Sequence, residues 1–576
     1  MSCRPYKMRR YLIMIMCGVV SLCLLSRDAR ADAPSLPSGQ DLEAQAERFR
    51  AEYSQDRQRV KETARPSIGF DDKNQEIPAP ATSFALTAVH VTGATIFDPA
   101  RFDFIWKTYV GTTVANRDLQ KIARMIKRVY MDLGYLSTLV YYPPQDVKNG
   151  EVEVRVVEGK RADLIVEGNT RNSTPSIAKY FHTYRGEPLD MGNIQKDMAR
   201  LNSNQDMKVA AVLSPGAAPE TVDVTLKVKE TSPYHVSVGA DNQGSRLTGR
   251  YRESLGFNTS NLTGNRDELS LNVVRTKMSS GEYVFYQVPV GTYGTKLGMD
   301  AGFFQAKLGQ EYLAYDITTA TQFYNPHASF ELYQSQELKA DLRTGLRLKS
   351  VEKKQASAIL TDEKLRLPYA AVDVVETDPK GQTNFSPEVS FNTPGMLGAS
   401  RRDNPLASRA GTDTAFVKYA QSVSRTQVMP WSSYAVVKSQ FQAASHTLPT
   451  SEQMQLGGVN SVRGYPEGDF LADMGANLNV DWHFPLYFVS PSAKLAGFNF
   501  REQLDPVLFF DMGQGRVYET TKTEIKEKFL AGVGGGFNIR IKNSALLKLQ
   551  WAKAVGDKPI HGAGPSVFSV SFQCGM

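Results

Sequence analysis

Long apolar segments are scarce in this chain of 576 residues. After residue 31, no stretch approaches the roughly 18 consecutive apolar residues that a transmembrane helix needs. A membrane protein without such helices must cross as a closed β-barrel, because only the barrel also pairs every backbone polar group internally. The absence therefore excludes an ordinary helical membrane protein and raises the question of whether barrel strands are present.

The chain also has few cysteines and a low net charge. Of the four cysteines, Cys3, Cys17 and Cys23 lie near the N-terminus and only Cys574 lies beyond residue 31. A single cysteine cannot form an internal disulfide, even in an oxidising compartment. The charge of +7 falls to about +2 without residues 1–31, which hold six basic side chains and one acidic one. Such a balance gives no electrostatic footprint for nucleic acid.

Motifs of enzymes and nucleotide-binding proteins are missing. The sequence contains no H-E-x-x-H, complete P-loop, G-x-G-x-x-G or G-x-S-x-G, and its seven histidines are dispersed. The run from Gly532 to Gly536 could suggest a phosphate cradle, but it lies in a segment with strand alternation. Glycines there more often allow bending or a close approach by a plug inside the barrel. We therefore expect no catalytic residue, no metal site, no cofactor and no nucleotide.

An export signal is present at the N-terminus. A basic stretch precedes an apolar run from Tyr11 to Leu25, and Ala29 and Ala31 offer small residues for cleavage before Asp32. This is the anatomy of a secretory signal peptide. An uncleaved anchor is the alternative, but about 15 apolar residues are short for a membrane span.

The next segment reads as a polar helix followed by a linker. Between Asp41 and Glu62, a thin apolar stripe recurs at helical spacing. So polar a helix suits a water-filled cavity, and a partly disordered segment is the alternative. From Thr63 to Ser83, prolines interrupt any helix, which predicts an extended linker.

Two similar segments then follow, with strands that end at Gly93 and at Gly168, 75 residues later. We expect strands at 86–91, 136–142 and 152–157 around a helix at 119–133 in the first segment, and strands at 164–166, 209–213 and 222–228 with helices at 176–183 and 191–201 in the second. Each segment is the size of a small α+β module.

From Tyr234 to the end, apolar and polar residues alternate over some 340 residues. The alternation is clearest at 476–484, 533–541, 547–551 and 568–572. One apolar and one polar face on each strand is typical of a transmembrane β-barrel, and this length accommodates about 16 strands, with 14 or 18 fitting almost as well. A soluble β-sandwich also alternates but seldom runs this long.

Two motifs indicate the kind of barrel. A glycine-rich loop contains Val462, Arg463, Gly464 and Tyr465, and a strand contains Phe509, Asp511 and Gly513. Together they resemble the V-R-G-[YF] loop and F-x-D strand of the Omp85 superfamily of outer-membrane translocators and insertases. The helix end with Tyr130, Gly134 and Tyr135 resembles the Y-x-x-x-G-Y of polypeptide-transport-associated (POTRA) modules. Two such modules before a barrel are similar to the two-partner secretion transporters, the hemolysin secretion/activation family.

The loop and strand motifs also make physical sense as a pair. The guanidinium of Arg463 is always charged and needs an acceptor if the loop folds into the barrel. Asp511 shares its strand face with Phe509 and Gly513, and a carboxylate facing lipid would be costly, so that face should line the lumen. We expect Arg463 and Asp511 to form a contact that pins the loop to the inner wall, screened by a wet lumen. The alternative is a solvated loop cation and a solitary acid.

The expected fold is mainly β: a C-terminal transmembrane antiparallel barrel preceded by two α+β POTRA modules and an N-terminal helix. The expected division is signal peptide 1–31, N-terminal plug helix region 32–62, linker 63–83, first POTRA module 84–159, second POTRA module 160–231, and barrel 232–576.

The resemblance implies an outer-membrane protein of a Gram-negative bacterium with its modules in the periplasm. It would capture an unfolded, exported passenger, such as a large β-helical adhesin or hemolysin, and secrete it through the barrel. An insertase that assembles other outer-membrane proteins is the alternative, and a passive porin would lack the modules and the loop motif. One departure is the C-terminus, which runs past Phe572 to Met576, whereas such barrels often end on an aromatic residue.

Overall fold

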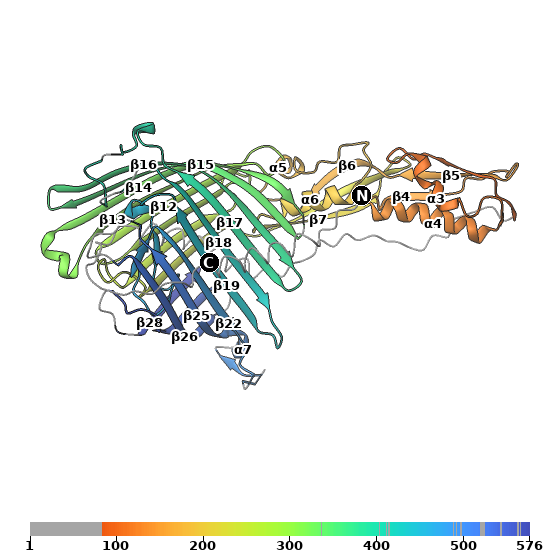
Figure 1. The fold of residues 1–576 in the computed structure, drawn as a ribbon. Helices are drawn as coiled ribbons and strands as arrows, with labels where there is room; N and C mark the ends of the chain where they lie inside the picture. Colours follow the sequence, from red (N-terminus) through yellow and green to blue (C-terminus); the bar gives the residue numbers. More distant parts are fainter. Residues whose placement is uncertain are drawn as a thin grey trace.

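The structure, a computed structural model, describes residues 83–575 apart from 336, 403, 410–411, 413–414, 488, 491, 496–497, 519–524, 542–543, 561–563 and 565. The predicted signal peptide, the N-terminal helix and the linker up to residue 82 lie outside the described residues. Two small modules extend in line from one end of a large β-barrel (Figure 1). No helix in the described part of the chain has the length and apolar character needed to cross a membrane.

The barrel is a closed antiparallel sheet of 16 strands, which confirms the expected fold and strand number. The strands are β9 (Tyr234–Asp241), β10 (Arg252–Thr259), β11 (Glu268–Arg275), β12 (Ser279–Pro289), β13 (Lys296–Lys307), β14 (Ile317–Gln334), β15 (Leu338–Gln355), β16 (Ala358–Asp378), β17 (Gly381–Phe391), β18 (Val417–Val428), β19 (Tyr434–Ala444), β22 (Met474–His483), β25 (Leu504–Arg516), β26 (Glu527–Ile541), β27 (Ala545–Ala554) and β28 (Ser566–Gly575). Every strand pairs with its neighbours in the chain, and β28 pairs with β9 to close the cylinder.

The alternation along the strands separates a lipid face from a lumen face. On β25, Leu508 and Phe510 are 50% and 42% exposed, whereas Phe509 and Asp511 between them are buried. The outward side chains are apolar because they meet hydrocarbon, and the inward ones can be polar because they meet the lumen. Asp511 therefore lies on the inner wall, as its place on the strand predicts.

The last residues of the chain take part in barrel closure. Ser571 to Gly575 pair with Asp241 to Ser237 on β9, so the strand continues beyond Phe572. Phe572 itself is 41% exposed on the outer face. The residues that follow this aromatic are thus part of the seam rather than a tail added to a finished strand.

Smaller elements occupy the connections. At the end of the barrel away from the modules lie η3 (Gln310–Tyr315), η4 (Met396–Gly398), η5 (Thr450–Glu452), β20 (Met454–Leu456) and β21 (Phe470–Ala472), and at the module end lie β23 (Lys494–Leu495), β24 (Phe498–Asn499) and α7 (Phe500–Gln503).

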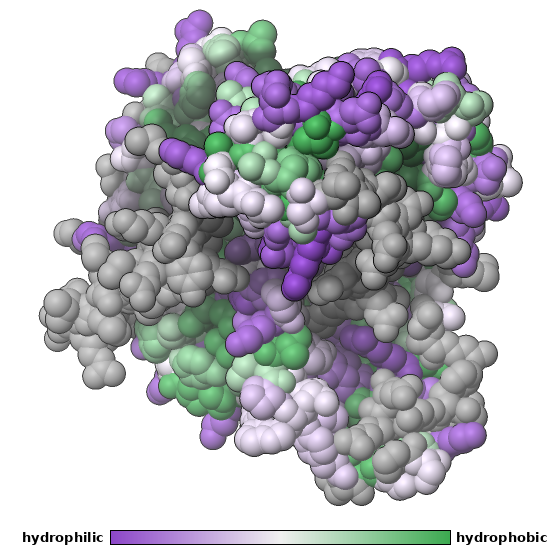
Figure 2. All heavy atoms as spheres, turned by 90° about the vertical axis from the view of Figure 1, so that its right-hand side faces the viewer, coloured by the Kyte–Doolittle hydropathy of each residue, from purple (hydrophilic) through white to green (hydrophobic). Residues whose placement is uncertain are grey.

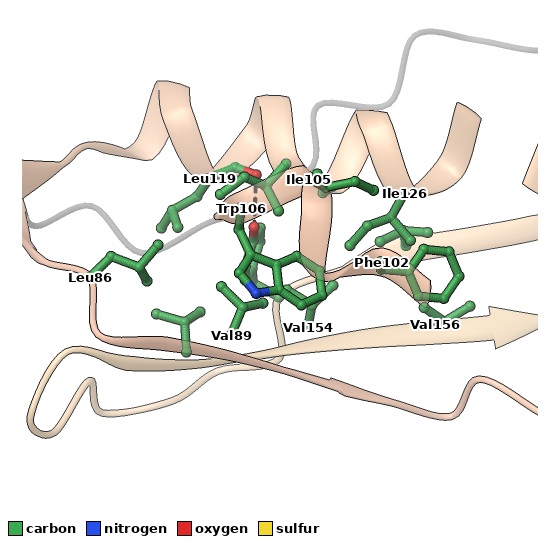
Figure 3. Close-up of a cluster of buried hydrophobic side chains, with 14 of the residues drawn as sticks. Leu86, Val89, Phe102, Ile105, Trp106, Leu119, Ile126, Val154 and Val156 are labelled. Carbon is green, nitrogen blue, oxygen red and sulfur yellow. Dashed lines mark hydrogen bonds between the residues drawn. The ribbon is translucent and has the colours of Figure 1, made fainter. Parts of the chain in front are cut away.

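The first module consists of β1 (Phe84–Ala85), β2 (Ala88–Thr92), η2 (Pro99–Phe102), α3 (Asp103–Trp106), β3 (Thr113–Val114), α4 (Asn116–Asp132), β4 (Thr138–Tyr141) and β5 (Glu151–Glu158). Its sheet has the order β2-β5-β4, and one face is covered by α4, whose Leu119, Ile122 and Ile126 are fully buried. Phe102 and Trp106 fill the space between α4 and the sheet (Figure 3). The sequence did not predict η2 and α3, which are too short to show a period.

The second module repeats this plan with β6 (Lys160–Glu167), α5 (Thr174–Ala178), α6 (Met191–Leu201), β7 (Met207–Pro215) and β8 (Thr221–Glu230). Its sheet has the order β6-β8-β7. The helix predicted at 176–183 is shorter and begins earlier, because the Ser173 side chain accepts from the Ser176 N–H and Pro175 stands in its first turn.

The same turn motif occurs in both modules. The backbone N–H and hydroxyl of Thr95 donate to Glu158 at the end of β5, and those of Thr170 donate to Glu230 at the end of β8. The two glycines that precede these threonines adopt positive φ, +79° at Gly93 and +85° at Gly168. A Cβ there would lie 2.2 or 2.4 Å from a carbonyl oxygen of the last strand, so both turns require glycine.

The second module is joined to the barrel by polar contacts. Arg200 on α6 donates through Nε and Nη2 to Glu331 on β14, at 2.9 and 2.7 Å. Arg266, in the turn after β10, donates to the Arg200 carbonyl at 2.9 Å and lies over the ring of Tyr180. These contacts identify the barrel end with the turns 260–267 and 290–295 as the periplasmic end.

Candidate functional site

The connection between β19 and β22, residues 445–473, starts at the end of the barrel away from the modules and folds inward. Val462 is fully buried and Tyr465 is 2% exposed. Both belong to a cluster with Leu456, Phe470 and Leu530, the last of which lies on the barrel wall. The loop therefore packs against the inner wall and reduces the open lumen.

Arg463 binds the wall through a two-pronged ion pair. Its Nε donates to Oδ2 of Asp511 and its Nη2 to Oδ1, each at 2.7 Å. The backbone N–H of Arg463 also donates to Oδ2, at 2.9 Å. A planar guanidinium matches a carboxylate in this way, which a lysine could not reproduce. The two motifs of the sequence are thus brought together.

The pair is buried, unlike the wet, screened contact expected from the sequence. The Arg463 side chain is 7% exposed and that of Asp511 is fully buried. Asp481 on β22 also accepts from Nη2 of Arg463, and Asn479 donates to Oδ1 of Asp511 at 2.8 Å. The guanidinium lies 3.6 Å above the centre of the Phe509 ring. One cation is therefore held by two carboxylates and an aromatic face.

Three glycines make room for the loop. A Cβ on Gly532 of β26 would lie 2.0 Å from the Arg463 carbonyl oxygen, and one on Gly513 would lie 2.9 Å from Val462. Gly464 has a φ of +96°, and a Cβ there would meet the backbone of Lys553 and Ala554. At Gly532 the close approach expected for the glycine run is made by this loop, and the predicted plug helix lies outside the described residues.

Tyr465 and the residues after it fix the far side of the loop. The Tyr465 hydroxyl donates to the carbonyl oxygen of Asp557, at 2.8 Å, in the connection that follows β27. Asp469 is 2% exposed, forms an ion pair with Lys528 on β26, and accepts from the Ile560 N–H at 2.9 Å. The loop is thus tied to β26 and to the connection that follows β27.

The start of the loop has a second charged anchor. Glu452 is 5% exposed and accepts from Nζ of Lys349 on β15 at 3.2 Å and from Nζ of Lys418 on β18. Asp473, at the end of the loop, accepts from Arg409 at 2.7 Å. Glu452 thus attaches the loop to β15 and β18, and Asp473 attaches it to the connection that precedes β18.

The sequence did not identify Asp481, Asn479, Asp469, Asp473, Glu452 or their lysine and arginine partners. The sequence held one signal for them. Asn479 and Asp481 occupy the polar, lumen-facing positions of their alternating strand, β22, which pairs with β25 beside Asp511. Their use by Arg463 depends on the register of β22 against β25, in which Asn479 is the cross-strand partner of Asp511.

The module motif lies at the junction of the two modules. The hydroxyl of Tyr130, at the end of α4, donates to Glu158 at 2.9 Å. Burial and the nearby carboxylate raise the pKa of Tyr130 above its ordinary value. Gly134 has a φ of +97°, and its carbonyl accepts from the N–H of Met191 on α6 at 2.9 Å. Tyr135 packs edge-on against Tyr130 within the first module, and the Gly134 bond to Met191 connects the first module to the second.

Comparison with known sequence families gives two matches. Residues 220–539 match the family described as haemolysin secretion/activation protein ShlB/FhaC/HecB. Residues 84–159 match the POTRA domain of ShlB type. The first match spans more than half of the chain, including the inward-folded loop, β25 and most of β26.

Individual relatives have low sequence identity to this chain, but the matches cover most of its length. The heme/hemopexin transporter protein HuxB of Haemophilus influenzae is 23% identical over 480 residues, covering 81% of this chain and 82% of its own. The structure of CdiB from Escherichia coli superposes with a TM-score of 0.72 at 17% identity and covers 95% of this chain and all of its own. The structure of BamA from Haemophilus ducreyi gives a TM-score of 0.52 at 13% identity over 86% of this chain. Both structures show a shared fold.

Proposed function

The chain belongs to the haemolysin secretion/activation family ShlB/FhaC/HecB, and on that premise we propose which parts of it handle the secreted partner. It is an outer-membrane two-partner secretion transporter with its modules in the periplasm. Its likeness to BamA extends to the fold alone, so the insertase alternative has less support than secretion. The observation that carries the proposal is the loop that folds into the lumen and is held there by Arg463 and Asp511.

The edge strands of the modules bind the passenger first. In the sheet order β2-β5-β4, strands β2 and β4 are edges, and in β6-β8-β7 the edges are β6 and β7. An unfolded chain can add a strand there through backbone hydrogen bonds, with little demand on its sequence. Seen from the module end, hydrophobic residues on the described surface lie in separate groups among hydrophilic ones (Figure 2). This mixed surface favours backbone recognition over one large apolar patch.

The lumen loop acts as the element that must be held in place for the passenger to pass. Its anchors on β15, β18, β25 and β26 keep it against the wall. Folding of the passenger outside supplies the driving force, because a folded β-helix cannot slide back.

The passenger is a large exported protein with β-helical structure, of adhesin or hemolysin type. Relatives carry names such as hemolysin transporter protein HpmB, of Proteus mirabilis, which is consistent with such a cargo. A very long repetitive exoprotein encoded next to this chain is the natural candidate to test.

The test is secretion of that exoprotein from cells that express this chain. Removing residues 84–159 should abolish secretion while the barrel still inserts, which heat-modifiability on gels reports. A matched control replaces Glu220, an exposed residue of the second module, by glutamine and should secrete normally. Normal secretion by the deletion variant would show that the first module is not the receptor, and failure of the full chain to secrete the exoprotein would exclude it as the passenger.

A further inference from the structure

A basic hollow lies on the rim of the barrel at the end away from the modules. Its volume is about 680 Å³, and it is lined by residues of the connection after β9, the ends of β10 and β11, the turn between β11 and β12, and Gln310. Four of the lining side chains are cations, Arg246, Arg250, Arg275 and Lys277, against the single carboxylate of Glu253. This hollow is separate from the lumen loop and its anchors.

Among the residues that the structure describes, three of these cations find no ion-pair partner. Arg246 forms an ion pair with Glu311 in η3. Arg250, Arg275 and Lys277 are exposed and form no ion pair with any residue in the described part of the chain. Like charges gathered in one hollow repel each other, so an anion bound among them would lower this repulsion.

The strand register places the hollow at the lipid surface. Arg275 and Glu253 are cross-strand partners at the ends of β11 and β10. The next outward pair along the strands is Leu255 with Val273, and Leu255 is 51% exposed. Two residues of a strand span roughly 7 Å, so Arg275 lies one step above the hydrocarbon, at the level of lipid headgroups. Tyr251, 80% exposed, lines the same hollow at this level, where tyrosine is common in membrane proteins.

The far end of the barrel faces the outer leaflet, because the modules occupy the periplasmic end (Figure 1). We propose that this hollow binds the phosphate groups of a phosphorylated glycolipid of the outer leaflet, of the lipid A type. Arginine binds phosphate oxygens in pairs through its planar fork, and lysine supplies a further point charge. Glu253 can accept a hydrogen bond from a sugar hydroxyl between the phosphates. The proposal is independent of which passenger the barrel secretes.

A bound lipid at this position would hold the connection 242–251 in place. This connection follows β9, which forms one side of the closing seam with β28. Gly309 donates to the Leu247 carbonyl at 2.8 Å and Met278 to the Thr248 carbonyl at 3.0 Å, so the connection already bridges the ends of several strands. The lipid phosphates would neutralise Arg250 in this connection and Lys277 in the β11–β12 turn, and so would reduce the repulsion between the two segments.

The test measures lipid binding to the full-length protein in phosphatidylcholine nanodiscs that contain lipid A, with native mass spectrometry as the readout. The variant combines Arg250→Ala, Arg275→Ala and Lys277→Ala. The matched control combines Lys364→Ala, Lys553→Ala and Lys558→Ala, which remove the same charge from exposed residues at the same end of the barrel, outside the hollow. We expect about a hundredfold weaker binding of lipid A in the first variant and unchanged binding in the control.

Two further arms identify the chemistry. Dephosphorylated lipid A should bind the unmodified protein as weakly as lipid A binds the triple variant, and free inorganic phosphate should fail to compete at comparable concentration. Equal lipid A binding by the triple variant and the unmodified protein would overturn the proposal. So would normal lipid A binding together with lost secretion in the triple variant, since the cations would then serve the passenger. Retention of heat-modifiability in both variants shows that each barrel is folded.

Discussion

Nε and Nη2 of Arg463 donate to the two carboxylate oxygens of Asp511 at 2.7 Å each, across 48 residues of sequence. Because both side chains are buried, the contact is a fixed point of the lumen loop rather than a screened surface pair. Asp481 shares the guanidinium, so removing either partner leaves charges that have lost their match.

Arg463→Ala should disturb the loop more than Asp511→Ala. The first change leaves two carboxylates facing each other without a cation, whereas the second leaves Arg463 paired with Asp481. Removing one partner of a buried ion pair costs about 3–5 kcal/mol. Here that cost would reduce the free energy with which the loop docks on the wall. Both variants should secrete much less passenger while the closed hydrogen-bonded barrel stays heat-modifiable. The measurement is passenger in the culture medium relative to barrel in the outer membrane.

The double variant of Arg463 and Asp511 tests whether the two residues act as one contact. Its loss of secretion should be close to that of the worse single variant. Strictly additive losses would mean that the residues act separately and would refute the pinned-loop mechanism.

Gly532→Ala should release the loop without touching either charge. The added methyl group would lie 2.0 Å from the Arg463 carbonyl oxygen, so the loop must move away from β26. Protease accessibility of the loop in intact cells should increase and secretion should fall. Gly535→Ala is the matched control on the outer face of the same strand, where its Cβ would meet the exposed side chain of Leu508 at 3.0 Å. Equal behaviour of the two variants would argue against steric docking at Gly532.

Glu230 makes the turn at Gly168 sensitive to acid. Burial alone would raise the pKa of Glu230, but hydrogen bonds from Asn172 and from backbone N–H groups of the turn lower it from 4.5 to about 2. A carboxyl with a lowered pKa stabilises the folded state above its unfolded pKa, and this contribution is lost as pH falls through the folded value. Protection of the turn should therefore decline between about pH 5 and pH 2.

The measurement is hydrogen exchange of residues 168–172, corrected for the intrinsic pH dependence of exchange. Glu230→Gln should reduce protection at neutral pH and flatten its dependence on pH. Glu220→Gln, in the same module, should preserve both. A pH profile unchanged by Glu230→Gln would show that another group controls this turn.

The N-terminal polar helix remains a prediction from the sequence. If residues 41–62 occupy the lumen, their removal should raise single-channel conductance in planar bilayers while the barrel stays folded. The increase should not depend on Arg463, since Arg463 is held by Asp511 and Asp481 of the barrel wall. Unchanged conductance would place the helix outside the pore.

Much of the fold could be predicted because it depends on local patterns. Lipid on one side and the lumen on the other impose a two-residue alternation on each strand, and segments such as 533–541 show it plainly. The long helix α4 was predicted from its apolar face, and the turns at Gly93 and Gly168 from their spacing. Short elements such as α3 and α5 were missed or misplaced, because four or five residues carry no readable period.

By itself the sequence determined that strands form a barrel and that two modules precede it, and together with the family resemblance it predicted a contact between Arg463 and Asp511. Only the tertiary structure decided that this pair is buried, that Asp481 shares the cation, and that Gly532 receives the loop backbone. It also gathered Arg250, Arg275 and Lys277 around one hollow at the rim. The physical reason is that alternation fixes which face a residue occupies, whereas its neighbours on that face depend on strand register and on closure of the barrel, which join residues far apart in the chain.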